Sequence, residues 1–106
     1  MREATFLILT ALADRPRHGY GIIQEVTVLS GGRVTLLPGT LYTALDRLAA
    51  QGLVELDNEE VIDGRLRRYY RLCVNGRTEL AHQSERLRQL ASAADSRLRT
   101  PRPSLA

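Results

Sequence analysis

The stretch Pro38-Gly39-Thr40-Leu41-Tyr42-Thr43-Ala44-Leu45 opens a short helix that decides the predicted fold. Pro38 supplies the fixed backbone angle that is favoured in a first helical turn, and Gly52 stops the helix. Between them, apolar residues recur at helical spacing, so one side of the helix is expected to face a core. This stripe consists of Leu41, Ala44, Leu45 and Leu48.

The opposite face of this helix is small and weakly charged. Small side chains allow a close approach to the edges of DNA bases. Arg47 could reach guanine O6 and N7, Asp46 could accept from cytosine N4, and the Thr43 methyl group could meet thymine. An ordinary surface helix is the alternative for this segment alone. With Leu41 turned to the core, the outward positions are Gly39, Thr43, Asp46, Arg47 and Ala50, and the flanking positions are Thr40 and Tyr42.

Two further helices are predicted before this one. Residues 3–14 are apolar almost all round, so this helix must be covered on two sides, by its own domain and by a second subunit. Pro16 breaks that pattern, and His18, interpreted as a structural hydrogen-bonding residue, leads into the second helix. The second helix carries Ile22, Val26 and Leu29 at helical spacing, and Ser30-Gly31-Gly32 ends it.

A β-hairpin with a basic face is predicted after the third helix. Residues 53–57 and 65–72 have strand-like patterns, and the hairpin dipeptide Asp63-Gly64 lies between them, with a flexible tip expected near residues 60–65. Pairing with Glu55, Asp57 and Glu59 across the hairpin is the alternative to DNA contact for this face. We expect Arg65 and Arg67 to be free for DNA and Arg71 to be structural. The basic face consists of Arg65, Arg67, Tyr69 and Arg71.

The chain is expected to end in a long helix over residues 75–98 and a disordered tail over residues 100–106. One seam of this helix recurs at alternating spacings of four and three, which suits packing against another helix. The seam consists of Leu80, Ser84, Leu87, Ala91, Ala94 and Leu98.

Three helices followed by a hairpin predict a winged helix-turn-helix. The expected fold class is therefore mainly α with a small β-hairpin. Residues 1–74 would form the DNA-binding domain and residues 75–99 a C-terminal dimerisation helix. In such a fold the third helix enters the major groove, and the hairpin lies along the DNA backbone or in the minor groove.

The charge distribution agrees with a polyanionic partner. The 106-residue chain has a formal net charge of +3, with five arginines and nine acidic residues in positions 1–63, and ten arginines and three acidic residues in positions 64–106. A basic half favours nucleic acid, although a solvated charged face is the alternative. All basic residues are arginine, which fits either coding bias or bidentate contacts to phosphate and guanine.

Several classes of protein do not fit the pattern. The longest apolar run, Phe6–Leu9, is far shorter than the roughly 20 residues of a membrane span, and no signal peptide is recognisable. We therefore expect a cytoplasmic protein with no membrane partner. The lone Cys73 allows no internal disulfide and no zinc finger. No nucleophile with a base, and no metal cluster, stands out, so we predict neither an enzyme nor a bound cofactor or metal.

Several motifs of the chain form a specific combination, namely His18-Gly19-Tyr20-Gly21-Ile22, Pro38 to Leu45, Leu48 to Val54, Gly64-Arg65, Arg68 to Leu72 and Gly76-Arg77. Together they resemble the PadR family of transcriptional regulators, over roughly residues 4–80. The resemblance implies a winged-helix repressor of the short subfamily, dimeric through its first and last helices, that responds to a small effector such as a phenolic acid. It also implies that Tyr42 and the Thr40 hydroxyl contact the DNA backbone and that the wing contacts flanking phosphates.

Three residues depart from the family pattern. Thr43 stands where proline is common, which leaves the helix start less rigid but adds a base contact. Leu66 stands where proline is frequent in the wing. Cys73 stands where a capping threonine often lies, and a thiol is a poor cap. Cys73 is therefore either a buried filler or a reactive or metal-binding thiol, with His82 as a partner.

The leading hypothesis is a dimeric, sequence-specific regulator of transcription that binds an inverted-repeat operator in double-stranded DNA, most simply a repressor relieved by a small effector at the dimer interface. The alternatives are a winged-helix protein-interaction module and a metal-responsive regulator that uses Cys73, His82 and the acidic residues of the wing. The predicted DNA contacts are Thr40, Tyr42, Thr43, Asp46, Arg47, Arg65, Arg67 and Tyr69. The predicted dimer contacts are Phe6, Leu7, Leu80, Leu87, Ala91, Ala94 and Leu98.

Overall fold

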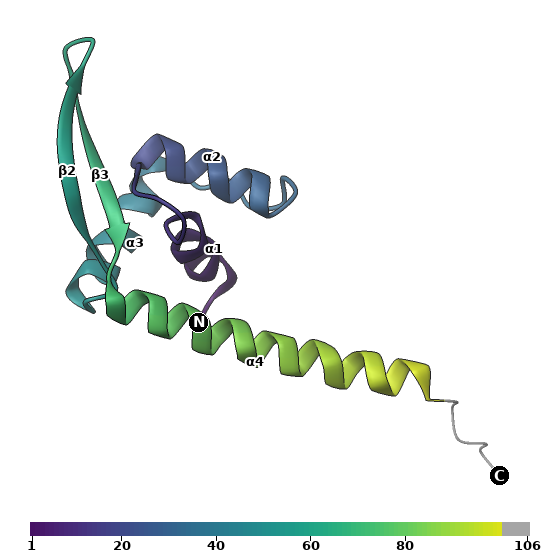
Figure 1. Cartoon of the computed structure of the whole chain (residues 1–106). Helices are drawn as coiled ribbons and strands as arrows, with labels where there is room; N and C mark the ends of the chain where they lie inside the picture. The colour runs from purple at the N-terminus through teal and green to yellow at the C-terminus, as the bar shows by residue number, and fades with distance from the viewer. Residues whose placement is uncertain (101–106) are drawn as a thin grey trace.

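A computed structural model describes residues 1–100 of the chain, and residues 101–106 of the predicted tail lie outside the described residues. The predicted helices and hairpin are present, in the order of a winged helix-turn-helix (Figure 1). The helix predicted over residues 3–14 is shorter than expected, since it ends at Ala11 and Leu12 is its C-cap residue. The elements are α1 (Glu3–Ala11), β1 (Arg17–His18), α2 (Gly19–Leu29), α3 (Pro38–Ala50), β2 (Val54–Ile62), β3 (Arg65–Leu72) and α4 (Val74–Arg99).

The core is built around α1, which packs against both α2 and α4 of the same chain. Its neighbours therefore cover much of the apolar surface for which the sequence predicted a second subunit. Leu7, a predicted dimer contact, is only 8% exposed and belongs to this core, whereas Phe6 is half-buried. The largest fully buried side chains are Ile8, Leu9, Leu12, Ile22, Val26, Leu41, Leu45, Leu48 and Val54.

The sheet has three strands within the described residues, one more than the predicted hairpin. The short strand β1 pairs antiparallel with β3, with Arg17 opposite Tyr70 and His18 opposite Tyr69, so the strand order is β1-β3-β2. Two residues are too short a run to show a strand pattern, and the partner strand supplies the hydrogen bonds that fix them. This pairing holds the start of α2 against the wing.

The wing formed by β2 and β3 is longer and more regular than predicted. The strands pair as far as Ile62 and Arg65, so the turn is Asp63-Gly64 alone rather than a flexible tip over residues 60–65. Both turn residues have positive φ angles, 52° and 75°, which a tight two-residue hairpin requires. A register shift between Leu56 and Asn58 bulges β2, while β3 keeps its alternation. The hairpin projects well beyond the helices (Figure 1).

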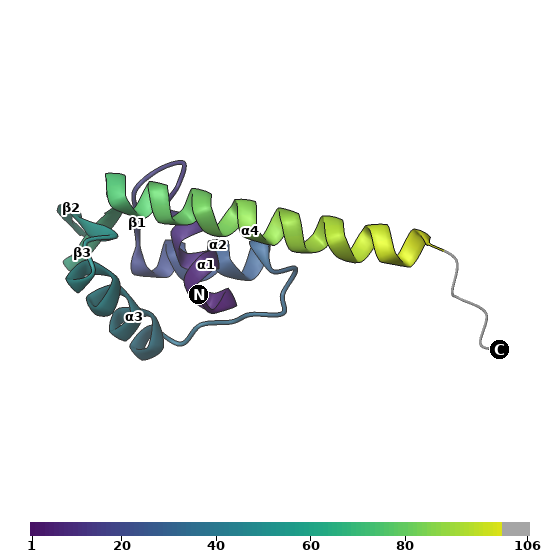
Figure 2. The same cartoon turned by 90° about the horizontal axis from the view of Figure 1, so that it is seen from below.

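Helix α4 begins in the domain and then leaves it. Its first turn packs closely, since a Cβ atom at Gly76 would lie 2.1 Å from the carbonyl oxygen of Leu53. Arg77 Nη2 donates to the carbonyl oxygen of Ala13 at 3.0 Å, and Leu80 packs against the core. The C-terminal half of the helix extends away from the other elements in both views (Figures 1 and 2). None of the helices in residues 1–100 is both long and apolar enough to cross a membrane.

Candidate DNA interface

Helix α3 presents the predicted reading face to solvent. Leu41, Leu45 and Leu48 are at most 1% exposed, which fixes the rotation of the helix about its axis. Pro38 occupies the first turn, as the sequence predicted. The helix therefore leaves the five predicted contacts exposed, namely Thr40, Tyr42, Thr43, Asp46 and Arg47.

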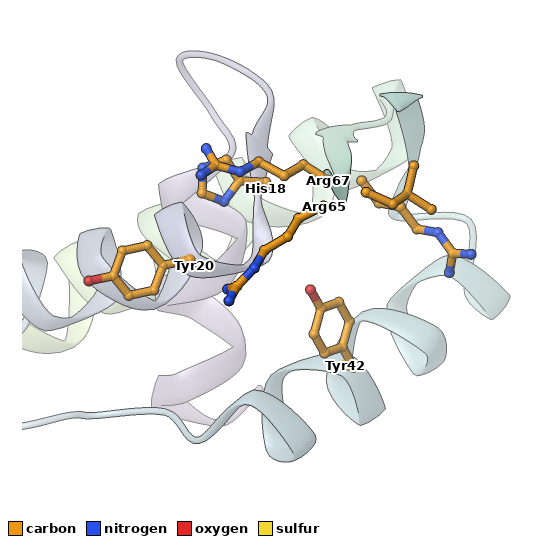
Figure 3. A pocket seen from close by; sticks show the side chains of 8 residues that line it. His18, Tyr20, Tyr42, Arg65 and Arg67 are labelled. Atoms are coloured by element: carbon orange, nitrogen blue, oxygen red, sulfur yellow. The ribbon is translucent and has the colours of Figure 1, made fainter. Parts of the chain in front are cut away.

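One flank of α3 rests on the start of α2. Gly19 is buried, and a Cβ atom built on it would lie 2.4 Å from the Tyr42 hydroxyl oxygen and 2.9 Å from the ring carbon that bears it. Only glycine at position 19 leaves room for the phenol in this place. The exposed ring of Tyr42 is thereby directed toward the wing (Figure 3).

The other flank of α3 is attached to α1. Arg47 Nη2 donates to Thr5 Oγ1 at 3.0 Å, across 42 positions of sequence. The guanidinium predicted to read guanine therefore lies beside α1 rather than over the centre of the outward face. Thr43 and Asp46 remain exposed on that face.

Acidic residues of β2 pair with two of the wing arginines. Arg71 Nε donates to Glu55 Oε1 at 2.7 Å, and its Nη1 lies 3.7 Å from Asp57. The hydrogen bond from Arg71 to Glu55 and the charge of that carboxylate raise the pKa of Arg71 further above its ordinary value. Arg68 lies 3.4 Å from Glu59. The structural assignment of Arg71 is confirmed.

Arg65 and Arg67, in contrast, have no acidic partner within residues 1–100. They border a hollow of about 670 Å³ between the wing, the start of α2 and α3, in which Arg65 points between Tyr20 and Tyr42 and Arg67 lies beside His18 (Figure 3). Uncompensated guanidinium groups and hydroxyl-bearing rings are the side chains that donate to phosphate oxygens. The lining residues are His18, Gly19, Tyr20, Tyr42 and Arg65 to Arg68.

His18 organises one wall of this hollow. It is the N-cap of α2, where the Gly21 backbone N–H donates to His18 Nδ1 at 3.2 Å. Its ring meets Tyr69 edge to face, with centroids 5.3 Å apart. Burial and the nearby Arg67 charge lower the pKa of His18 below its ordinary value. The structural interpretation of His18 is confirmed, and Tyr69, a predicted DNA contact, is half-buried against it and does not line the hollow.

Five residues that line the hollow were not among the predicted DNA contacts: His18, Gly19, Tyr20, Leu66 and Arg68. Tyr20 is 65% exposed at the start of α2. The His-Gly-Tyr-Gly motif was the available signal, but only the pairing of β1 with β3 shows that this motif lies beside the wing.

Residues 8–82 match the family model described as the transcriptional regulator PadR-like family. The chain belongs to this family. It is a DNA-binding regulator of transcription and not an enzyme, as the sequence motifs predicted.

This PadR-like chain is similar to a named transcriptional regulator and to solved structures of PadR family proteins. The transcriptional regulator Rv3488 of Mycobacterium tuberculosis is 43% identical over 84 residues, which are 79% of this chain and 75% of the relative. A PadR family regulator from Clostridium difficile R20291 has a TM-score of 0.75 at 26% identity, with 92% of this chain and 99% of that chain covered. Bacillus subtilis PadR, solved in complex with operator DNA, has a TM-score of 0.65 at 20% identity, covering 99% of this chain and 54% of that chain.

The predicted dimer residues of this PadR-like chain divide into two groups. Leu7 is buried, and Phe6 and Leu80 are half-buried within the single chain. The remaining seam residues of α4 are exposed, with Leu87 42% and Leu98 83% accessible. Phe6 and Leu87 face a shared hollow of about 470 Å³ between α1, the end of α2 and α4. The exposed seam residues are Leu87, Ala91, Ala94 and Leu98.

The structure offers this PadR-like chain no preformed metal site within residues 1–100, where no three His, Cys, Asp or Glu side chains are suitably grouped. Cys73 is the half-buried N-cap residue of α4, and its side chain makes no capping hydrogen bond. Burial and the Glu55 carboxylate raise the pKa of Cys73 above its ordinary value, which favours the unreactive thiol. These features favour the filler role over the reactive one.

Proposed function

We propose that this PadR-like regulator is a repressor that binds an inverted-repeat operator as a homodimer and is released by a small effector. The observation that carries the DNA-binding part is the hollow beside Tyr42, where Arg65 and Arg67 have no acidic partner while their neighbours Arg68 and Arg71 do. Although Glu60 lies opposite Arg67 across the hairpin, neither Arg65 nor Arg67 forms an ion pair with a wing acid, so their guanidinium groups remain available next to the reading helix. A DNA backbone is the partner that this arrangement suits.

In this proposal α3 enters the major groove. Thr43 and Asp46 face base edges, and the Thr40 and Tyr42 hydroxyl groups contact the backbone. Arg65 and Arg67 bind phosphates beside the wing and give affinity rather than sequence choice. The same fold in Bacillus subtilis PadR has been solved in complex with operator DNA, which supports this use of the fold.

The exposed seam of α4 supports the homodimer. Leu87 is exposed where α4 still borders α1 and α2, and Leu98 is exposed near the far end of the helix. Exposed apolar patches of this kind mark interfaces. The small residues Ala91 and Ala94 let a partner helix approach closely. A two-fold symmetric dimer presents two copies of α3, so its operator is an inverted repeat.

The hollow between α1, α2 and α4 is the proposed effector site. It is lined by apolar side chains, including Phe6, Leu29 and Leu87, and the ion pair between Arg33 and Glu3, at 2.6 Å, lies at its edge. Because Leu87 also belongs to the seam, a bound molecule would touch the dimer interface. An effector there would alter the separation of the two α3 helices and hence the fit to the operator.

The test compares the double variant Arg65→Ala/Arg67→Ala with Arg97→Ala/Arg99→Ala, which makes the same charge change at the far end of α4. Binding to the operator and to an unrelated duplex is measured over a series of salt concentrations. We expect the wing variant to bind both duplexes more weakly and with a flatter salt dependence, since each lost phosphate contact lowers the slope by about 0.9. Equal binding by the two variants would show that the wing role is wrong.

The interaction-module alternative makes the opposite prediction for DNA. If the protein were such a module, the wild-type chain would bind no genomic fragment even at low salt, where electrostatic binding is strongest. The experiment that separates the regulator from the interaction module is retention of genomic DNA fragments by the protein at low salt, followed by their release as the salt concentration is raised. No feature of residues 1–100 favours the metal-responsive alternative over the repressor.

A further inference from the structure

A second hollow bordered by arginines lies on the flank of α3 that faces away from the wing. It has a volume of about 640 Å³ and separates α3 from α1 and from the segment that leads into α3. A smaller hollow of about 420 Å³ continues it toward α4. Arg2, Thr5 and Arg47 line both hollows. Figure 2 shows the start of α1 on the same side of the molecule as α3.

The arginines of this hollow are uncompensated, like those of the wing. Neither Arg2 nor Arg47 has an acidic partner within residues 1–100, although Arg17 and Arg33 do. Glu79 lines the far end of the smaller hollow, where its carboxylate accepts from Gln83. Both flanks of α3 therefore present arginines that form no ion pair within residues 1–100.

The flanks of α3 are set by the rotation that buries Leu41. Tyr42 follows it by about 100° on the wing side, and Arg47 lies at the opposite edge, where Thr5 accepts its hydrogen bond. Thr43 and Asp46 lie between these two edges. The helix thus has a centre with Thr43 and the Asp46 carboxylate between two edges that are bordered by arginines.

The shape of the major groove matches this arrangement. The groove is about 12 Å wide and is bounded by the backbones of both strands. A helix with its side chains is about 10–12 Å across, so a helix that lies in the groove has one backbone along each edge. With α3 in the groove, the wing flank would face one backbone and the flank with Arg47 the other.

We propose that Arg2 and Arg47 bind phosphates of the backbone on the side of the groove away from the wing, and that Thr5 positions the Arg47 guanidinium for this contact. The proposal rests on the proposed function, because it requires that α3 enters the major groove. It assigns Arg47 to the backbone instead of to guanine. It also adds the start of α1 to the DNA interface.

The test uses the full chain and two duplexes, its selected operator and an unrelated sequence of equal length. Arg2→Ala and Arg47→Ala are compared with Arg99→Ala, which removes the same charge at the distant end of α4. Phosphate contacts predict that each of the first two variants binds both duplexes about three- to tenfold more weakly. They also predict that the salt slope of a dimer falls by about 1.8, because one contact is lost per subunit. The base preference obtained by operator selection stays unchanged.

The role of Thr5 is tested by Thr5→Val, which removes the hydroxyl, and Thr5→Ser, which keeps it. The valine variant is expected to lose part of the affinity that Arg47→Ala loses, and to add little when combined with it. The serine variant is expected to bind like the parent. Additive losses from Thr5→Val and Arg47→Ala would contradict the positioning role.

Two outcomes would overturn the phosphate assignment. If Arg47→Ala changes the preference at one base pair and leaves binding to the unrelated duplex intact, Arg47 reads a base. If Arg2→Ala behaves like Arg99→Ala, the start of α1 does not contact DNA. In either case, weakened binding by Arg65→Ala/Arg67→Ala would leave the proposed function standing, whereas a parent chain that binds no duplex would remove the proposed function itself.

Discussion

The Tyr42 hydroxyl occupies the space that a side chain at Gly19 would need, since a Cβ atom there would lie 2.4 Å from that oxygen. This contact joins the start of α2 to the reading helix at the point where the wing also converges. It links the Gly19 and Tyr42 positions although they lie 23 positions apart in the sequence.

Gly19→Ala is expected to move Tyr42 without unfolding the domain. The clash involves the far end of a side chain that can swing outward, and alanine is the better helix former. The melting temperature should therefore change little, while operator binding weakens by about 1 kcal/mol per site through the displaced hydroxyl. Tyr42→Phe alone should weaken operator binding about as much as the double variant Gly19→Ala/Tyr42→Phe does, because both changes remove the same hydroxyl contact. Independent, additive losses of binding would argue against the linkage.

Gly76→Ala is expected to destabilise the fold by about 2–3 kcal/mol, as overpacking in a tight site does. The obstacle there is the Leu53 backbone carbonyl at 2.1 Å, which cannot swing away. Gly39→Ala is the matched control, because a Cβ atom at Gly39 meets nothing within 4 Å in a helix of the same chain. Chemical denaturation should show a loss of stability at position 76 and none at position 39. A Gly76→Ala variant as stable as the parent would refute the packing described for the start of α4.

Acidification is expected to weaken the start of α2 through His18. Burial and the Arg67 charge lower the pKa of His18 in the folded state, so its contribution to stability is complete above about pH 6.5 and is lost as the pH falls through the lowered value. Protonated Nδ1 can no longer accept the Gly21 N–H. His18→Asn keeps a capping acceptor that does not titrate. Between pH 8 and pH 5 the parent should lose more thermal stability than His18→Asn, and parallel curves would count against this role.

Charged substitutions in the α4 seam are expected to separate the dimer without unfolding the subunit. Leu87 and Ala94 are exposed in the single chain, so Leu87→Glu and Ala94→Glu leave the core intact but place like charges across the proposed interface. Sedimentation should report monomers with unchanged helical circular dichroism. Gln89→Glu, on another face of α4, should remain dimeric. A dimeric Leu87→Glu/Ala94→Glu variant would mean that subunits associate elsewhere.

Much of the fold could be predicted from residues whose conformational preference in the sequence matches the position they take in the folded chain. Pro38 and Gly52 bound α3, Leu41 sets its rotation, and Asp63-Gly64 adopts the turn that its residue types favour. The strand at Arg17 and His18 was not predictable in the same way, because its only support is pairing with a segment some fifty positions later. Long-range pairing of so short a strand leaves no periodicity in the sequence.

The DNA interface was predicted in outline but not in detail, because its details depend on contacts between residues that are far apart in the sequence. The position of Arg65 and Arg67 near the hairpin tip was enough to expect that they are free, whereas Arg71, farther from the tip, was expected to be structural and is paired with Glu55 and Asp57. Arg47 was assigned to the outward face from its helical angle alone. That angle says nothing of Thr5, whose hydroxyl is brought within 3.0 Å by the packing of α1. The half-buried position of Tyr69 against His18 likewise depends on β1.

A hydroxyl-radical footprint on the selected operator tests the central claim most directly. Two α3 helices in one symmetric dimer predict two equivalent protected regions related by a dyad, with centres about 34 Å, or roughly ten base pairs, or a multiple of this apart. Arg65→Ala/Arg67→Ala should weaken protection at the outer, wing-contacted phosphates of both regions. A single asymmetric region, or no protection at a salt concentration low enough to favour electrostatic binding, would contradict the account.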